Sequence, residues 1–103
     1  MMENDKLLSM LGMARKAGKT ALGADDILSQ INKRKCCFVL ISEDLSENSK
    51  KKIVNACEYN KIEYINTTYS KEKMGKAVGL IEVSAAGFTE KGFAQAAKKL
   101  IDR

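Results

Sequence analysis

The sequence predicts an α/β protein, with helices packed on both faces of a sheet of about four strands in an α/β/α sandwich. Helix-like and strand-like segments alternate along the chain, and 45% of its 103 residues are apolar, enough to fill one core. No repeat, low-complexity tract or linker divides the sequence, and its length does not allow a second lobe. We therefore expect residues 1–103 to form a single domain.

Several segments carry helical signals. Residues 5–17 place apolar side chains on one helix face and stop at Gly18, a residue typical of the turn past a helix end. Residues 24–35 begin with acids and end with bases, as the helix dipole prefers. Hydroxyl residues suited to cap a helix precede the others: Ser46 before a helix through Tyr59, Ser70 before a helix ending near Gly79, and Thr89 before a final helix.

The segments between them predict strands. Residues 36–42 read CCFVLIS, a continuous apolar run flanked by charge, which is typical of a central strand covered on both faces. Shorter extended segments are expected at residues 19–23, 62–66 and 83–88.

The composition limits the kinds of function. The chain has no histidine, and Cys36, Cys37 and Cys57 lack the spacing of a metal knuckle or redox pair. We therefore expect no enzyme, no metal site and no cofactor, with the cysteines as apolar filler. Residues 1–5 lack the basic start of a signal peptide, and no apolar run could span a bilayer, so we expect a cytoplasmic protein without membrane contact.

Two short patterns look like chemical motifs. Residues 17–20 (AGKT) look like the tail of a phosphate-binding loop, but Met13 stands where that motif needs glycine, and a helix precedes it instead of a strand. A helix end followed by a lysine is the better interpretation. The acid pairs at residues 25–26 and 43–44 could hold magnesium or share a proton, or could flank helix starts; no nucleophile or third ligand accompanies them, which favours the structural role.

Positive charge indicates a polyanionic partner. Lysine and arginine number 18 against 13 acids, giving a net charge of +5. The bases cluster at residues 15–19, 33–35, 50–52, 71–76 and 98–99. Each cluster is most simply a solvated helix face, yet together they suit binding to phosphates. No aromatic run of the kind that stacks single-stranded bases accompanies them, which favours folded RNA.

A family resemblance rests on an ordered set of short segments: residues 14–19 (ARKAGK), 23–26 (GADD), 39–44 (VLISED) and 80–83 (LIEV). The sequence resembles the ribosomal L7Ae/L30e superfamily of kink-turn RNA-binding proteins. Residues 46–52 (SENSKKK) and 89–93 (TEKGF) are similar to its bacterial YlxQ-type members. The resemblance implies an L30e-like α/β/α sandwich with a small mixed four-stranded sheet, and a non-enzymatic role.

The resemblance also implies where RNA binds. In a kink turn, sheared G·A pairs follow a short bulge; the family reads guanine edges with the start of its second helix and covers a flipped-out nucleotide with an apolar loop. The matching positions are Gly23, Ala24, Asp25 and Asp26 in the helix start, and Leu80, Ile81, Glu82 and Val83 in the loop, with Ile81 and Val83 as the apolar cover. Lys71 matches a lysine that contacts the RNA backbone, and Lys19 and Lys50 are expected to contact phosphates as well.

The helix start departs from the family pattern. Where the family usually has asparagine, glutamate and, three positions later, lysine, this chain has Asp25, Asp26 and Ser29. Aspartate accepts a hydrogen bond from a guanine amino group but cannot donate one, and it adds negative charge beside phosphates. Ser29 provides no charged phosphate contact.

We therefore predict a monomeric cytoplasmic domain that binds structured, kink-turn-like RNA. Ribosomal RNA is a candidate partner, and a ribonucleoprotein is a candidate assembly. Two alternatives stay open: a general RNA- or ribosome-associated factor without kink-turn specificity, and a protein-interaction module on the same fold.

Overall fold

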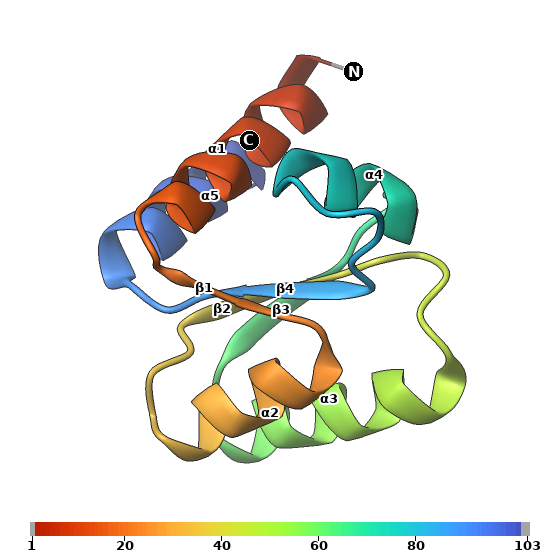
Figure 1. Ribbon diagram of the computed structural model, residues 1–103. Helices are drawn as coiled ribbons and strands as arrows, with labels where there is room; N and C mark the ends of the chain where they lie inside the picture. The colour runs from red at the N-terminus through yellow and green to blue at the C-terminus, as the bar shows by residue number, and fades with distance from the viewer. Residues whose placement is uncertain (1, 102–103) are drawn as a thin grey trace.

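The computed structural model describes the backbone of residues 2–101 and the side chains of residues 6–101, and it is an α/β/α sandwich (Figure 1). Residues 1, 102 and 103, at the ends of the expected 1–103 domain, lie outside the described residues. The elements are α1 (Met2–Lys16), β1 (Thr20–Leu22), α2 (Ala24–Asn32), β2 (Phe38–Ile41), α3 (Glu47–Tyr59), β3 (Glu63–Asn66), α4 (Lys71–Ala77), β4 (Ala85–Phe88) and α5 (Lys91–Ile101). Within the described part of the chain, no helix is both long and apolar enough to cross a membrane.

The sheet is four-stranded and mixed, as the resemblance implies, with the strand order β1-β4-β2-β3. β2 and β3 are parallel, whereas β4 is antiparallel to both of its neighbours, β1 and β2. β1, β2 and β3 therefore point the same way, and their carboxyl ends meet at one edge of the sheet, where β4 begins. This edge brings together segments that are far apart in the sequence.

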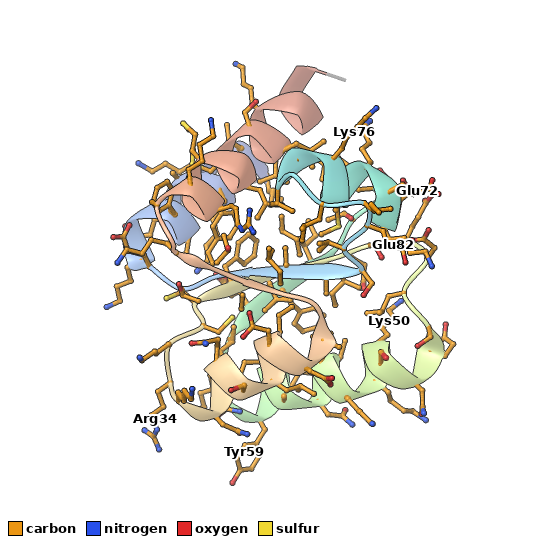
Figure 2. All side chains as sticks on the ribbon, viewed as in Figure 1. Arg34, Lys50, Tyr59, Glu72, Lys76 and Glu82 are labelled. Carbon is orange, nitrogen blue, oxygen red and sulfur yellow. The ribbon has the colours of Figure 1, made fainter. Side chains whose placement is uncertain are left out.

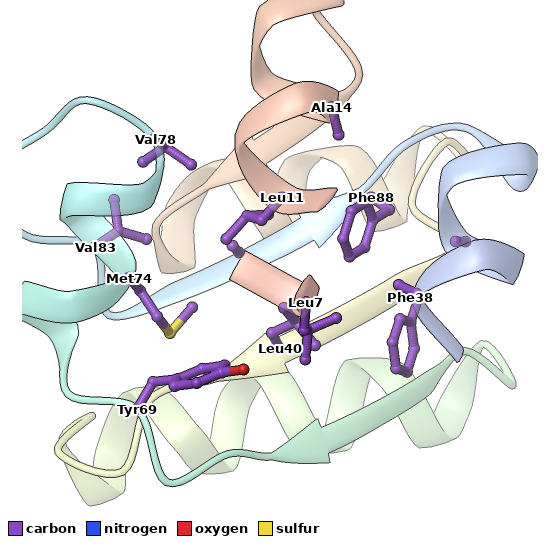
Figure 3. Close-up of a cluster of buried hydrophobic side chains, with 13 residues drawn as sticks. Leu7, Leu11, Ala14, Phe38, Leu40, Tyr69, Met74, Val78, Val83 and Phe88 are labelled. Atoms are coloured by element: carbon purple, nitrogen blue, oxygen red, sulfur yellow. The ribbon is translucent and has the colours of Figure 1, made fainter. Parts of the chain in front are cut away.

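Two clusters of buried side chains fix the helical layers to the sheet. Phe38 and Leu40 of β2 pack with the layer of α1, α4 and α5, whereas Val39 and Ile41 pack with α2 and α3 (Figure 1). In the first cluster the rings of Phe38 and Phe88 stack with their centroids 6.2 Å apart (Figure 3). The prediction of a central strand covered on both faces is confirmed.

Local signals correctly predicted where two helices begin and where one ends. The hydroxyl oxygens of Ser46 and Ser70 each accept a hydrogen bond from an amide in the first turn of the following helix. Gly18 adopts a left-handed φ of 73°, and the N–H of Lys19 donates to the carbonyl of Ala14 at 2.9 Å. The AGKT segment is therefore a helix end and not a phosphate-binding loop.

The predicted cap of the last helix, Thr89, is wrong. α5 begins at Lys91, and the carbonyl of Glu90 accepts the N–H of Ala94, so Glu90 flanks the helix. Thr89 donates its N–H to the carbonyl of Lys19 and so continues the pairing of β4 with β1. Because this bond ties Thr89 to β1, the helix begins only two residues later, at Lys91.

Other predicted boundaries were too wide. α2 ends at Asn32, so the bases at 33–35 lie beyond it, because Arg34 turns the chain with a left-handed φ of 60°. β2 begins at Phe38 instead of residue 36, and β4 begins at Ala85 instead of residue 83. Before β4, the N–H of Val83 donates to the carbonyl of Lys71 at the start of α4, whereas the carbonyl of Ser84 accepts the N–H of Ser42 beside the end of β2.

The thiols of Cys36 and of Cys57, a residue of α3, are buried in the cluster between the sheet and the layer of α2 and α3, consistent with apolar filler. Burial is the largest cause that raises the pKa of Cys36 to about 12 and that of Cys57 to about 11. In the folded protein, both thiols therefore stay protonated at pH values at which a solvated thiol has already ionised.

From the raised pKa values of these two thiols we predict that the folded protein becomes less stable at alkaline pH. In the unfolded chain they ionise near the ordinary value of 9.0, so above about pH 9 the folded state binds more protons than the unfolded state, and the free energy of unfolding falls as pH rises toward 11. Urea titrations at pH 7 and at about pH 10 measure this fall. The Cys36→Ala/Cys57→Ala variant is expected to show a shallower pH dependence; an equal dependence in both proteins would contradict the prediction.

Candidate functional site

An open groove lies at the edge of the sheet where β1 and β2 end and β4 begins. Most residues that line it come from the predicted site or directly follow strand β2; we call it the edge groove. The predicted residues among them are Gly23, Lys71, Leu80, Glu82 and Val83. The fold thus brings together the start of α2, the head of α4 and the loop before β4.

Gly23 joins β1 to α2 in a conformation that only glycine adopts readily, with φ 90° and ψ 160°. Its N–H donates to the carbonyl of Ala85 at 2.8 Å, which ties the start of α2 to β4. Gly23 has no side chain to cap the helix, and the first turn of a helix leaves N–H groups without intrahelical acceptors. This end of α2 therefore presents hydrogen-bond donors and the positive end of the helix dipole.

The two acids of this helix start differ in their contacts. Asp26 accepts a hydrogen bond from the N–H of Leu22 at 3.0 Å and so holds the turn between β1 and α2. Asp25 is exposed beside it, and Ala24 is half-buried against the α2–α3 cluster. Ser29 lies about one turn further along α2 and is half-buried.

Lys71 connects three parts of the groove. Its N–H donates to Asp44 Oδ1 at 2.9 Å, and its carbonyl accepts the N–H of Val83 at 2.9 Å. Its ammonium group lies 4.0 Å from Glu82 Oε2, and both side chains are about half exposed, so this ion pair stabilises the fold by at most about 1 kcal/mol. The ammonium group can therefore exchange Glu82 for a bound anion at little cost.

The loop before β4 exposes apolar side chains. Ile81 is 90% exposed and Leu80 is 42% exposed, whereas Val83 is 5% exposed and belongs to the core. The expected apolar cover by Val83 is therefore corrected: its side chain anchors the loop, and Leu80 and Ile81 provide the accessible apolar surface. The side chain of Val83 packs in the same cluster as Met74 and Val78, while its N–H donates to the Lys71 carbonyl.

The loop approaches α4 closely because position 75 has no side chain. A Cβ atom on Gly75 would lie 2.5 Å from the Cα of Glu82, closer than real contacts allow. The N–H of Leu80 also donates to the Gly75 carbonyl at 2.8 Å, after a left-handed turn at Gly79. Gly75 therefore sets the position of the loop over the groove.

The predicted lysines do not all lie at the groove. Lys50 is half-buried in the first turns of α3, and Figure 2 shows it on the same side of the molecule as Glu82. Lys19 lies at the other end of β1 from Gly23, about 13 Å away at the rise of a strand. The structure thus separates Lys19 from the groove.

Sequence reasoning missed a group of groove residues that follow β2. Asp44, Leu45, Ser46 and Ser49 line the groove. The sequence contained a usable signal, since these residues come directly after a predicted central strand, and ligands of α/β sheets often bind where strands end. To place these residues at the groove, the sequence would also have had to reveal the order of the strands in the sheet.

The groove contains hydrogen-bond donors, acceptors and exposed apolar carbon. Among the described residues, no group of three or more Cys, Asp or Glu side chains is placed to hold a metal ion. The acid pairs at 25–26 and 43–44 flank the starts of α2 and α3, as the structural interpretation expected. Asp26 accepts the N–H of Leu22 beside it, whereas Asp44 accepts the N–H of Lys71 at the head of α4, a distant contact that was not expected. The arrangement offers one cation, carboxylate acceptors, backbone N–H donors and apolar carbon, which suits a ligand with flat polar edges.

This fold and groove define a small α/β/α binding protein. The chain belongs to the Ribosomal protein L7Ae/L30e/S12e/Gadd45 family, which it matches over residues 5–98. The resemblance deduced from the sequence is confirmed.

Individual relatives cover almost the whole chain. It is 31% identical over 93 residues to the RNA-binding protein YlxQ of Bacillus subtilis, covering 90% of this chain and 92% of that protein. It is 28% identical over 97 residues to the RNA-binding protein YlxQ of Enterococcus faecium, covering 94% and 92% of the two chains.

Solved structures share the fold. A Bacillus halodurans protein of unknown function superposes with a TM-score of 0.88 at 26% identity, covering 95% of this chain and 98% of that chain. A Giardia lamblia 15.5 kD RNA-binding protein superposes with a TM-score of 0.81 at 19% identity, covering 98% and 86% of the two chains.

The close approach at Gly75 yields a stability prediction. Gly75→Ala is expected to lower the free energy of unfolding by about 1–3 kcal/mol, because its methyl group meets the backbone of Glu82. Gly92→Ala in α5 is the matched control: its methyl group has only an ordinary 3.5 Å contact with Glu90 Oε1, and alanine favours the helix. Urea unfolding compares them, and an equal effect of both substitutions would refute the role of Gly75.

Proposed function

We propose that this chain binds structured RNA at the edge groove and recognises a kink-turn-like bend. The observation that carries the proposal is the meeting of the α2 start, Lys71 and the exposed loop at one edge of the sheet. The RNA-binding relatives that match over 90% of the chain support it.

The α2 start provides the contacts to base edges. Gly23 leaves the first-turn amides of α2 uncovered, so that a guanine acceptor can approach them closely. Asp25 accepts from a guanine amino group, and Asp26 keeps one oxygen on Leu22 and offers the other to the RNA. Ser29 offers a hydroxyl group further along α2.

The other elements hold the RNA backbone and the bulged nucleotide. Lys71 and Lys50 contact phosphates, and Leu80 and Ile81 cover the flipped-out base. Because Lys19 lies at the other end of β1 from Gly23, in this proposal it contacts an arm of the RNA beyond the bend. The net charge of +5 attracts the RNA, while the mixed groove provides selectivity.

In this proposal the protein is a non-enzymatic, monomeric, cytoplasmic component of the translation machinery or of a ribonucleoprotein, with ribosomal RNA as the candidate partner. Asp25, Asp26 and Ser29 favour one alternative, a general RNA-associated factor, because two carboxylates beside phosphates weaken a specific contact.

Kink-turn recognition is tested by gel shift at moderate salt. A kink-turn RNA is expected to bind at least about tenfold more tightly than a matched RNA whose G·A pairs are replaced by Watson–Crick pairs, because the α2 amides meet guanine edges only in the bend. Equal affinities for the two RNAs would instead support the alternative of a general RNA-associated factor. No binding to either RNA would favour a protein-interaction module instead.

Gly23 provides a second test. Gly23→Glu is expected to weaken kink-turn binding by about tenfold or more, because its carboxylate repels phosphates and covers the amides. Gly23→Ala imposes the same backbone strain without the charge, and Gln95→Glu adds the same charge at an exposed position of α5, which does not line the groove. Anisotropy titrations of the folded variants should show the large loss of kink-turn affinity with Gly23→Glu alone. Unchanged affinity of the Gly23→Glu variant would show that the RNA-binding site lies elsewhere.

A further inference from the structure

A second pocket lies where α2 and α3 end. Arg34, Cys36, Tyr59, Asn60 and Lys61 are among the residues that line it, and we call it the helix-end pocket. Figure 2 shows Arg34 and Tyr59 projecting from the same end of the molecule, away from the side that carries Lys50 and Glu82. The edge groove adjoins the other end of α2, about 14 Å away at the rise of a helix.

The backbone of this pocket is not explained by stability. α1 and α4 end in left-handed turns at glycines, Gly18 and Gly79, whereas α2 and α3 end in the same kind of turn at Arg34, with φ 60°, and Lys61, with φ 58°. A residue with a Cβ atom is strained in this conformation, and glycine is not. Stability alone would therefore favour glycine at both positions.

Attraction to the helix dipoles does not explain these cations either. The carboxyl ends of helices attract positive charge, but a base in the last helical turn would meet that attraction without strain. Neither α2 nor α3 has a base in its last turn. Both helices instead place the cation just beyond, at the strained position that lines the pocket.

An aromatic ring accompanies the cations. Tyr59 is the last residue of α3 and is 87% exposed. Lys33 and Lys35 flank Arg34 in the sequence and are exposed as well. The neighbouring acid Glu58 accepts a hydrogen bond from the hydroxyl of Tyr64 at 2.8 Å. The pocket thus joins an accessible ring to excess positive charge.

We propose that the helix-end pocket is a second RNA-binding surface, which takes a single-stranded segment. A base stacks on Tyr59, and the adjoining phosphates lie against Arg34 and Lys61, the combination of ring and cations by which proteins hold single strands. This surface does not depend on the edge groove. With both occupied, one chain holds two RNA segments at opposite ends of α2.

The test is fluorescence anisotropy of the full chain with a labelled oligouridine as the probe. Tyr59→Ala is expected to weaken binding about tenfold, and Tyr59→Phe to retain it, because phenylalanine keeps the stacking face. The Arg34→Gly/Lys61→Gly variant should bind oligouridine more weakly, and the magnitude of its slope of log affinity against log salt should fall by about 1.4, because two phosphate contacts are lost. The melting temperature of this variant is expected to stay equal or to rise, because glycine relieves the backbone strain.

The control removes the same charge elsewhere. Lys91→Ala/Lys99→Ala on α5 is expected to lower oligouridine affinity much less. Binding to a kink-turn RNA without single-stranded tails should be unchanged by the pocket variants, whereas Gly23→Glu should weaken that binding and spare oligouridine, so the two sites fail separately. Oligouridine affinity that is unchanged in the pocket variants, or lowered equally in the control, would overturn the proposal, as would pocket-dependent binding of a polyglutamate peptide without oligouridine binding.

Discussion

The position of β4 between β1 and β2 is the constraint on which the rest of the structure depends. β4 is the last strand in the sequence, and it pairs antiparallel with both neighbours. Its small buried residues allow close packing: a Cβ atom on Gly87 would lie 2.8 Å from Cys36 Sγ. Because β4 starts at the edge where β1 and β2 end, the loop that precedes it enters the groove beside the start of α2.

Hydrogen bonds to main-chain N–H groups complete this edge. The N–H of Gly23 donates to the carbonyl of Ala85, and the N–H of Val83 donates to the carbonyl of Lys71. The N–H of Lys71 donates to the short side chain of Asp44, at Oδ1. These bonds connect the α2 start, the α4 head and the loop through two backbone carbonyls and one aspartate, which are more rigidly held than long side chains. Ile81 and the Lys71 ammonium group thus stay accessible while the frame that positions them is fixed.

Local sequence patterns predicted the elements well, because caps, apolar periodicity and glycine turns act within a few residues. Ser46, Ser70 and Gly18 perform their predicted structural roles. The errors arose where a distant partner decides the backbone. Thr89 is held by Lys19 across the sheet, and Val83 is held by Lys71, so neither behaves as its neighbours in the sequence suggest.

The sequence by itself determined the α/β/α layers, the central strand, the positive charge and the family, since these follow from composition and short-range order. Only the tertiary structure decided which distant residues meet. It joined Asp44 to Lys71 and separated Lys19 from Gly23, although the second pair is far closer in the sequence. The reason is the strand order. The insertion of β4 between β1 and β2 determines which strand ends lie at the same edge of the sheet, and no local sequence pattern encodes that choice.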